Sequence, residues 1–281
     1  MNDLPLAGRK TVVLGGSQGI GLAVAFGMAR AGAHLILVAR GRAALNEAHE
    51  QLSRSGFSAS VFQASVLEKE ALAGIVDRSS GAEVLVNCAG VQGDISPFHE
   101  TGIEGWKTTF DINFFGTVNG MAAVLPGMIE RRRGKIINFS GGGANYPRPN
   151  FSAYGAAKAA VVRLTETLAE ELKDFHIQVN AVSPGMIKTR MIDQILTAGP
   201  EKAGKEHGQI QRMVERGFDS LDDVVDLCLF LASEESNWLT GKNISAVWDP
   251  WKEWRDKGRP SLDRDLYALR RIDGRTFVKA T

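Results

Sequence analysis

The chain has 281 residues, of which 44% are hydrophobic and 23% charged, and its formal net charge is +1 at pH 7. A chain of this size can bury the core of one large domain. The small net charge provides no overall field that would attract nucleic acid or an anionic membrane surface, so neither is expected as a partner.

The N-terminus and the cysteines indicate a cytoplasmic protein. The first residues, Met1 to Pro5, lack the basic stretch and the apolar run of a secretory signal. We expect no run that approaches the ~20 apolar residues needed to span a bilayer. Cys88 and Cys228 lie far apart, with no partners at metal-ligand spacing, which predicts two buried free thiols and no metal site.

Apolar stretches typical of strands alternate with stretches of helical period along most of the chain. Strands are predicted at residues 10–14, 34–39, 60–63, 84–87, 135–139, 178–183 and 243–247. Helices are predicted near residues 20–31, 42–55, 68–78, 105–132, 153–174 and 220–233. The alternation predicts an α/β fold: a single-domain, doubly wound, parallel, seven-stranded sheet of the Rossmann type, with helices on both faces.

Two segments depart from this alternation. Residues 186–218 are polar and contain Gly-Pro and isolated glycines, which predicts a mobile, lid-like insertion or loose helices. Residues 248–281 carry many charges and aromatic side chains, among them Trp251 and Phe277, without a clear period. We therefore expect a main domain at 1–247 and a C-terminal tail at 248–281, packed on that domain or on a neighbouring subunit.

The turn after the first predicted strand is rich in glycine and opens a helix. Its residues are Gly15, Gly16, Ser17, Gln18, Gly19, Ile20 and Gly21. Glycines let the backbone approach a pyrophosphate closely, and the helix N-terminus offers unpaired N–H groups to it. The turn predicts a dinucleotide site; a tight turn that packs without a ligand is the alternative.

The end of the second predicted strand favours NADP as the cofactor. Dinucleotide folds that take NAD place an acidic residue there for the ribose hydroxyls, whereas this chain has Ala39, Arg40, Gly41 and Arg42. Guanidinium groups can instead neutralise a 2′-phosphate. NAD remains a second candidate, and Arg40 and Arg42 as merely solvated residues are the alternative.

Tyr154 and Lys158 are four residues apart and so share one face of a predicted helix. A neighbouring ammonium favours the phenolate, so we expect Lys158 to lower the pKa of Tyr154 from its usual value of about 10. The pair could then work as a coupled acid and base. An exposed helical pair without chemistry is the alternative.

These sequence motifs occur in the same chain and in the order expected for one protein family. Over residues 8–247, the glycine turn, Asn87-Cys88-Ala89-Gly90, Asn113, Tyr154-x-x-x-Lys158 and Pro184-Gly185 resemble the short-chain dehydrogenase/reductase family. The resemblance implies an NAD(P)-dependent oxidoreductase that interconverts a small carbonyl compound and an alcohol by hydride transfer. It also implies a homodimer or homotetramer, assembled through the long helices at 105–132 and 153–174.

The resemblance assigns roles to particular residues. Tyr154 would be the general acid/base, Lys158 would bind the nicotinamide ribose, and Asn113 would hold a water that connects Lys158 to solvent. Each of these residues has a purely structural alternative: Asn113 could be a helix-kink residue, Pro184-Gly185 a turn and Thr189 a helix cap. The implied cofactor contacts are Gly15, Ser17, Gln18, Gly19, Ile20, Gly21, Arg40, Arg42, Ser65, Val66, Asn87, Ala89, Gly90, Tyr154, Lys158, Pro184, Gly185, Ile187 and Thr189.

The chain also departs from the family pattern. The family's catalytic serine lies thirteen residues before the tyrosine, a position that Gly141 occupies here, and Ser140 precedes it. We expect Ser140 to substitute as the donor to the reacting oxygen. Ser65 replaces an aspartate that often contacts adenine, and the family's ending after the seventh strand is absent. These departures motivate an alternative function, a catalytically impaired NADP-binding sensor or scaffold of the same fold.

Overall fold

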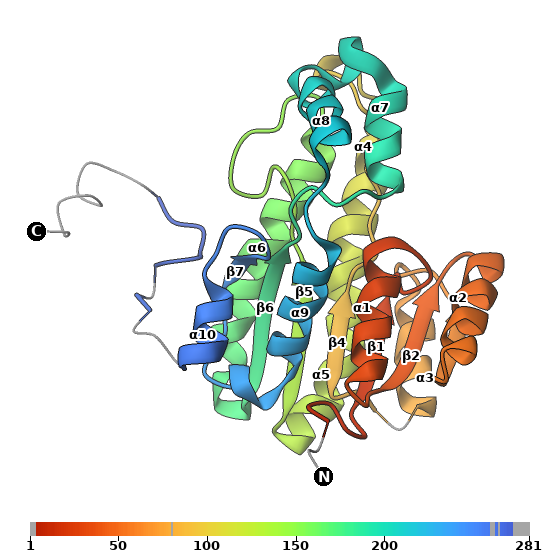
Figure 1. Ribbon diagram of the computed structural model, residues 1–281, viewed down its shortest axis with the longest axis vertical. Coiled ribbons are helices and arrows are strands. Elements are labelled where there is room, and N and C mark those ends of the chain that lie inside the picture. The colour runs from red at the N-terminus through yellow and green to blue at the C-terminus, as the bar shows by residue number, and fades with distance from the viewer. Residues whose placement is uncertain (1–3, 80, 259–261, 264, 272–281) are drawn as a thin grey trace, which may run out of the picture.

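A computed structural model describes residues 4–79, 81–258, 262–263 and 265–271 (Figure 1). Its centre is a sheet of seven parallel strands in the order β3-β2-β1-β4-β5-β6-β7. The strands are β1 (Lys10–Leu14), β2 (His34–Ala39), β3 (Ala59–Gln63), β4 (Val84–Asn87), β5 (Gly134–Phe139), β6 (Ile177–Ser183) and β7 (Asn243–Ser245). The predicted fold class, a doubly wound parallel sheet, is confirmed.

Helices cover both faces of this sheet (Figure 1). They are α1 (Gly19–Arg30), α2 (Arg42–Arg54), α3 (Lys69–Arg78), α4 (Ile103–Phe110), α5 (Gly116–Arg131), α6 (Ser152–Leu172), α7 (Arg190–Ala203), α8 (Lys205–Arg216), α9 (Leu221–Ala232) and α10 (Trp251–Lys257). Val13 packs into a core with α1, α2 and α9, whereas its neighbours Val12 and Leu14 pack into a second core with α3, α5 and α6. Because strand side chains alternate between faces, both cores draw on the same strands.

The reversal of strand order beside β1 sets the position of the site. From β1 the chain winds outward to β2 and β3, and then returns to β4 on the other side of β1. Leu14 pairs with Asn87, and Asn87 pairs with Asn138, so β1, β4 and β5 reach their carboxyl ends in register. Ligands of doubly wound sheets bind outside the strand ends at such a reversal.

The predicted helix at 105–132 is interrupted. It consists of α4, a π-helical segment (Asp111–Phe115) and α5. Within the described residues, one stretch, Ile103–Arg131, is long and apolar enough to cross a membrane, so the prediction that no such run exists is wrong. Of its apolar window, 44% is buried inside the protein, and length and composition alone are weak evidence for a membrane span.

Residues 186–218 form two helices, α7 and α8, above the carboxyl ends of the strands (Figure 1). They pack through a small core of their own, made by Phe151, Ile192, Ile195, Ala203 and Ile210. The polar composition of the segment concealed this pattern, because only a few apolar residues are needed to seat two short helices on Phe151.

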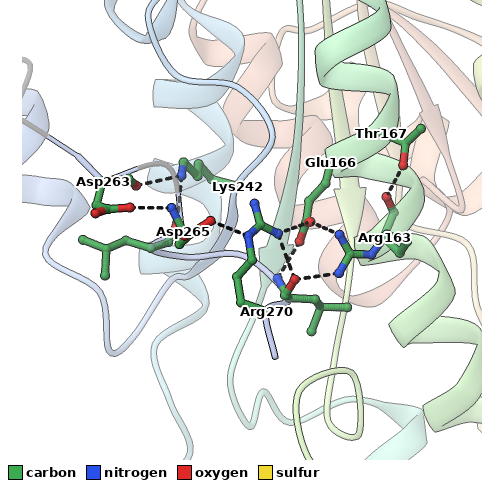
Figure 2. Close-up of polar contacts among 9 residues, drawn as sticks. Arg163, Glu166, Thr167, Lys242, Asp263, Asp265 and Arg270 are labelled. Atoms are coloured by element: carbon green, nitrogen blue, oxygen red, sulfur yellow. Dashed lines mark hydrogen bonds and ion pairs between the residues drawn. The ribbon is translucent and has the colours of Figure 1, made fainter. Parts of the chain in front are cut away.

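The described part of the tail contacts its own chain. Trp251 and Trp254 of α10 belong to the core beside α9, and the Trp254 ring lies 5.0 Å from that of Tyr267. Figure 2 shows Arg270 directed toward Glu166 of α6, at 2.7 Å. The predicted tail residues 259–261, 264 and 272–281, with Phe277 among them, lie outside the described residues.

Replacing Trp251 with alanine is predicted to lower the free energy of unfolding by about 3–5 kcal/mol. Trp251 is fully buried, its ring lies 6.4 Å from that of Phe230, and its Nε1 donates to the Ala246 carbonyl at 3.0 Å. Urea denaturation measures the change. The matched control is Trp248→Ala, since Trp248 is 81% exposed and its loss should change stability by less than about 0.5 kcal/mol. Equal effects would refute the role of Trp251.

Candidate active site

The glycine turn between β1 and α1 is packed so closely that side chains cannot replace its glycines. A Cβ on Gly15 would lie 2.7 Å from the Ala89 backbone, and one on Gly21 would lie 2.2 Å from the Gly15 carbonyl oxygen. Gln18 and Gly19 are exposed at the start of α1, where no side chain caps the helix. The first turn of α1 therefore keeps free N–H groups, which suits an anionic ligand.

The ends of β2 and β3 form the outer part of the same edge. Arg40 and Arg42 are both exposed, and the Arg42 Nε donates to the Gln63 side chain at 2.9 Å. The Ser65 backbone N–H donates to Glu68, and the Val66 carbonyl accepts from Asn119 at 3.0 Å. Two exposed guanidinium groups thus lie at this edge, and that of Arg42 is held by Gln63.

Segments far apart in the chain meet beside this turn. A Cβ built on Gly19 would lie 3.9 Å from Thr189 Cγ2, and one built on Gly90 would lie 3.6 Å from Met191 Cε. Thr189 is also the N-cap residue of α7, as its alternative interpretation predicted, although its side chain makes no capping hydrogen bond. Gly185, after Pro184, has a φ of 79°, and Ile187 is buried.

Tyr154, Lys158 and Asn113 are buried together beyond Gly90. Tyr154 and Lys158 lie on α6, with the Lys158 Nζ 5.6 Å from the centroid of the Tyr154 ring. The Lys158 Nζ donates to the Phe139 carbonyl at 2.9 Å. A Cβ built on Gly90 would lie 2.8 Å from Asn113 Oδ1 and 3.8 Å from Lys158 Nζ. An exposed helical pair is therefore excluded.

Burial controls the proton affinities of this cluster. It lowers the pKa of Lys158 from its usual 10.5 to about 8, with Cys88 opposing the shift. It also raises the pKa of Tyr154 above its usual 10.0, with Arg148 opposing the shift and Glu206 and Cys88 adding to it. The predicted lowering of the Tyr154 pKa is wrong for the protein without ligands, because desolvation of the phenolate outweighs the neighbouring charges.

Asn113 lies inside the π-helical segment, where its amide bridges two parts of the chain. Its Nδ2 donates to the carbonyls of Val91, at 2.9 Å, and Thr109, at 2.8 Å. Its Oδ1 is buried and has no hydrogen-bond partner within the described part of the chain. Asn113 thus sits at the helix irregularity, as its alternative interpretation held, and it also presents an unsatisfied acceptor to the site.

Ser140 and Gly141 bear on the expected donor to the reacting oxygen. The Ser140 Oγ donates to Asn243 Oδ1 of β7 at 2.7 Å, and Ser140 is only 3% exposed. A Cβ on Gly141 would lie 2.5 Å from the Tyr154 hydroxyl. Gly141 thus faces the tyrosine while the Ser140 hydroxyl is engaged on β7, and this arrangement argues against Ser140 as the substitute for the family serine.

Asn87 makes a buried polar contact behind the site. Its Nδ2 donates to Asn138 at 2.8 Å, and Asn138 donates to Thr165 of α6 at 2.9 Å. This buried series joins β4, β5 and α6 directly behind the site. Asn87 therefore shapes the floor from within, whereas Ala89 and Gly90 form its surface.

Sequence reasoning missed an ion pair next to Tyr154. Arg148, in the loop after β5, makes a two-point contact with Glu206 of α8, with 2.7 Å between Arg148 Nε and Glu206 Oε2. The Arg148 Cζ lies 5.1 Å from the centroid of the Tyr154 ring. Neither residue belongs to a motif, and 58 positions separate them. No signal in one sequence points to their pairing.

Comparison with known proteins agrees with this geometry. The family described as short chain dehydrogenase matches residues 9–198, more than half of the chain. The chain belongs to the short-chain dehydrogenase/reductase family. A curated relative, 2,3-dihydro-2,3-dihydroxybenzoate dehydrogenase of Bacillus subtilis (strain 168), is 31% identical over 87% of this chain and 96% of its own length.

Solved structures of the family share the fold. NAD⁺-bound xylitol dehydrogenase superposes with a TM-score of 0.77 at 28% identity, over 85% of this chain and 98% of its own. Gluconate 5-dehydrogenase from Burkholderia cenocepacia J2315, in complex with NADP and tartrate, superposes with a TM-score of 0.73 at 26% identity, over 87% and 95%. Relatives of this kind support an oxidoreductase that uses a nicotinamide cofactor.

Replacing Lys158 with methionine is predicted to change how stability depends on pH. The native lysine loses its proton near pH 8 and the unfolded one near 10.5, so burial of the charge destabilises the wild type below pH 8. As pH rises from 8 to 10.5, the wild type should regain stability, and the difference in unfolding free energy, variant minus wild type, should fall. Urea denaturation across this range measures it. A difference that does not vary with pH would contradict the burial of the Lys158 charge. The pKa of Lys135 is also lowered, but this lysine is present in both proteins, so its effect on stability cancels in the difference.

Proposed function

We propose that this protein is an NADP-preferring oxidoreductase that interconverts a small carbonyl compound and a primary or secondary alcohol. The observation that carries the proposal is the joint burial of Tyr154, Lys158 and Asn113 beside Gly90, at the strand ends that the glycine turn adjoins. A protein that only bound a nucleotide would not need a phenol and an ammonium held in this position.

The residues present fit a nicotinamide dinucleotide. The Cβ positions of Gly15 and Gly21 are taken by the chain's own backbone, which keeps the turn tight and leaves Gln18 and Gly19 exposed at the start of α1. The buried acceptor of Asn113 has no donor among the described residues. The pyrophosphate would be held by Ser17, Gln18, Gly19 and Ile20. The adenine side would be held by Ser65 and Val66, and the nicotinamide side by Asn87, Ala89, Gly90, Pro184, Gly185, Ile187 and Thr189. The cofactor supplies the hydride, and the protein supplies orientation and the proton.

Tyr154 would move the proton. With its pKa raised by burial, the phenol is neutral at neutral pH, the form that donates to a carbonyl oxygen during reduction. In the reverse direction the phenolate accepts the alcohol proton. Lys158, mostly charged below its pKa of about 8, would stabilise that phenolate and bind the nicotinamide ribose, and Asn113 would hold a water through which the proton is exchanged with solvent.

Further features of the proposal concern assembly. We place the catalytic domain at residues 1–247 and the tail at 248–281, and we expect a cytoplasmic homodimer or homotetramer. Ile103 and Phe115, which are 58% and 46% exposed, leave apolar surface on the α4–α5 side.

A catalytically impaired NADP-binding sensor is the second candidate. Gly141 favours it, because the hydroxyl that would share the reacting oxygen with the tyrosine is missing at that position. Mixing the protein with NADPH and a panel of ketones and aldehydes separates the candidates. Bound cofactor without any change in nicotinamide absorbance would support the sensor.

Tyr154→Phe is predicted to abolish turnover, with a fall of at least 100-fold in kcat, on the order expected for loss of a general acid. NADPH affinity should stay within about threefold, since the ring that packs the site is retained. Steady-state kinetics and fluorescence titration of NADPH measure the two quantities. Retained turnover would remove Tyr154 from its role, and equal loss of both would indicate a packing defect.

Arg40→Ala is predicted to weaken NADPH binding by at least tenfold and to leave NADH binding nearly unchanged. The reason is that a guanidinium pairs with the 2′-phosphate, which NADH lacks. Arg54→Ala, an exposed arginine near the end of α2, is the matched control. Equal weakening of NADPH and NADH by Arg40→Ala would refute the preference for NADP.

A further inference from the structure

Arg148, in the loop after β5, lies over the ring of Tyr154. Its Cζ lies 5.1 Å from the centroid of the Tyr154 ring, compared with 5.6 Å for the Lys158 Nζ, and 3.9 Å from the centroid of the Phe151 ring. The Arg148 side chain is 11% exposed and that of Glu206 is 16% exposed. Two cations therefore lie within about 6 Å of the centroid of the Tyr154 ring, and the family pattern accounts for only Lys158.

The same corner lacks the family's hydroxyl. Gly141 faces the Tyr154 hydroxyl, and Ser140 donates to Asn243 on the far side. A Cβ on Gly142, the next residue along, would lie 3.7 Å from both Cδ and Nε of Arg148. The Arg148 side chain thus packs against Gly142, the residue after the position where the family has its serine.

We propose that Arg148 replaces the missing serine as the group that stabilises negative charge on the reacting oxygen, and that Glu206 on α8 limits this effect. The proposal rests on the proposed function for its reaction. In alcohol oxidation, the proton passes from the substrate hydroxyl to the Tyr154 phenolate, and the hydride leaves to the oxidised nicotinamide. In reduction both return, and Arg148 favours the transient oxyanion character of the substrate oxygen.

The charges around Tyr154 support this assignment. The titratable and charged groups that face it are Arg148 from the loop after β5, Glu206 from α8, Lys158 from α6 and Cys88 beyond β4. Arg148 favours the phenolate, whereas Glu206 and Cys88 disfavour it. Because α8 shares a small core with Phe151, through Ile210, the position of Glu206 is coupled to the loop that carries Arg148.

The first experiment needs no substrate. The chain has three tyrosines, so isotopically labelled tyrosine gives few NMR signals, and Tyr154→Phe identifies the one from Tyr154. Arg148→Met should raise the pKa of Tyr154, Glu206→Gln should lower it, and Arg148→Lys should leave it near the wild-type value. Arg163→Met, which removes an arginine from the ion pair with Glu166, is the control and should not change it. Circular dichroism verifies that each variant is folded.

The second experiment tests replacement of the serine. Arg148→Met should lower kcat by about 100-fold, the loss typical of one oxyanion donor, and should move the alkaline rise of the oxidation rate to higher pH. Arg148→Lys, which keeps a cation, should retain at least tenfold more activity than Arg148→Met. Arg148→Gln, which keeps a polar side chain without the charge, should retain no more than Arg148→Met.

Two results would overturn the proposal. One is a Tyr154 pKa that is the same in wild type, Arg148→Met and Glu206→Gln. The other is an equal kcat for Arg148→Lys and Arg148→Gln. If the wild type turns over no carbonyl compound while the Tyr154 pKa shifts as expected, the proposed function fails and the electrostatic assignment of Arg148 is supported.

Discussion

The site depends on a buried ammonium held by the end of a central strand. Lys158 donates to the carbonyl of Phe139, the last residue of β5, and thereby ties α6 to the sheet at the point where β1, β4 and β5 end together. An ion with so little exposure is tolerated only when hydrogen-bonded or partly neutralised. The pKa of Lys158 is lowered because burial disfavours its charged form.

The groups around this ammonium are in environments that lower the stability of the folded protein. Burial of Tyr154 disfavours its ionised form and so raises its pKa. The Asn113 Oδ1 has no hydrogen-bond donor among the described residues. Such unfavourable features persist where the surrounding structure determines them, and they concentrate at functional sites. Here the surrounding structure is the Asn87–Asn138–Thr165 series, which locks β4, β5 and α6 behind the cluster.

Local sequence patterns predicted most of the strands of the sheet and part of the candidate site. The predicted bounds of β1, β2 and β4 agree with the structure to the residue, because short apolar runs between turns allow little else. The pairing of Tyr154 with Lys158 followed from helix geometry alone. The π-helical break at Asp111–Phe115 was not predicted, and helices at 186–218 were only one of two predicted alternatives, because each depends on a few contacts made by distant parts of the chain.

The sequence by itself determined the family, the parallel α/β sheet and the glycine turn, since all of these rest on spacings within one or two neighbouring elements. Only the tertiary structure decided where side chains point. It turned the Ser140 hydroxyl toward β7, set Gly141 against Tyr154, and brought Arg148 and Glu206 together over the ring. The reason is physical: orientation and burial arise from long-range packing, and burial can reverse the pKa shift that a neighbouring charge would produce in water.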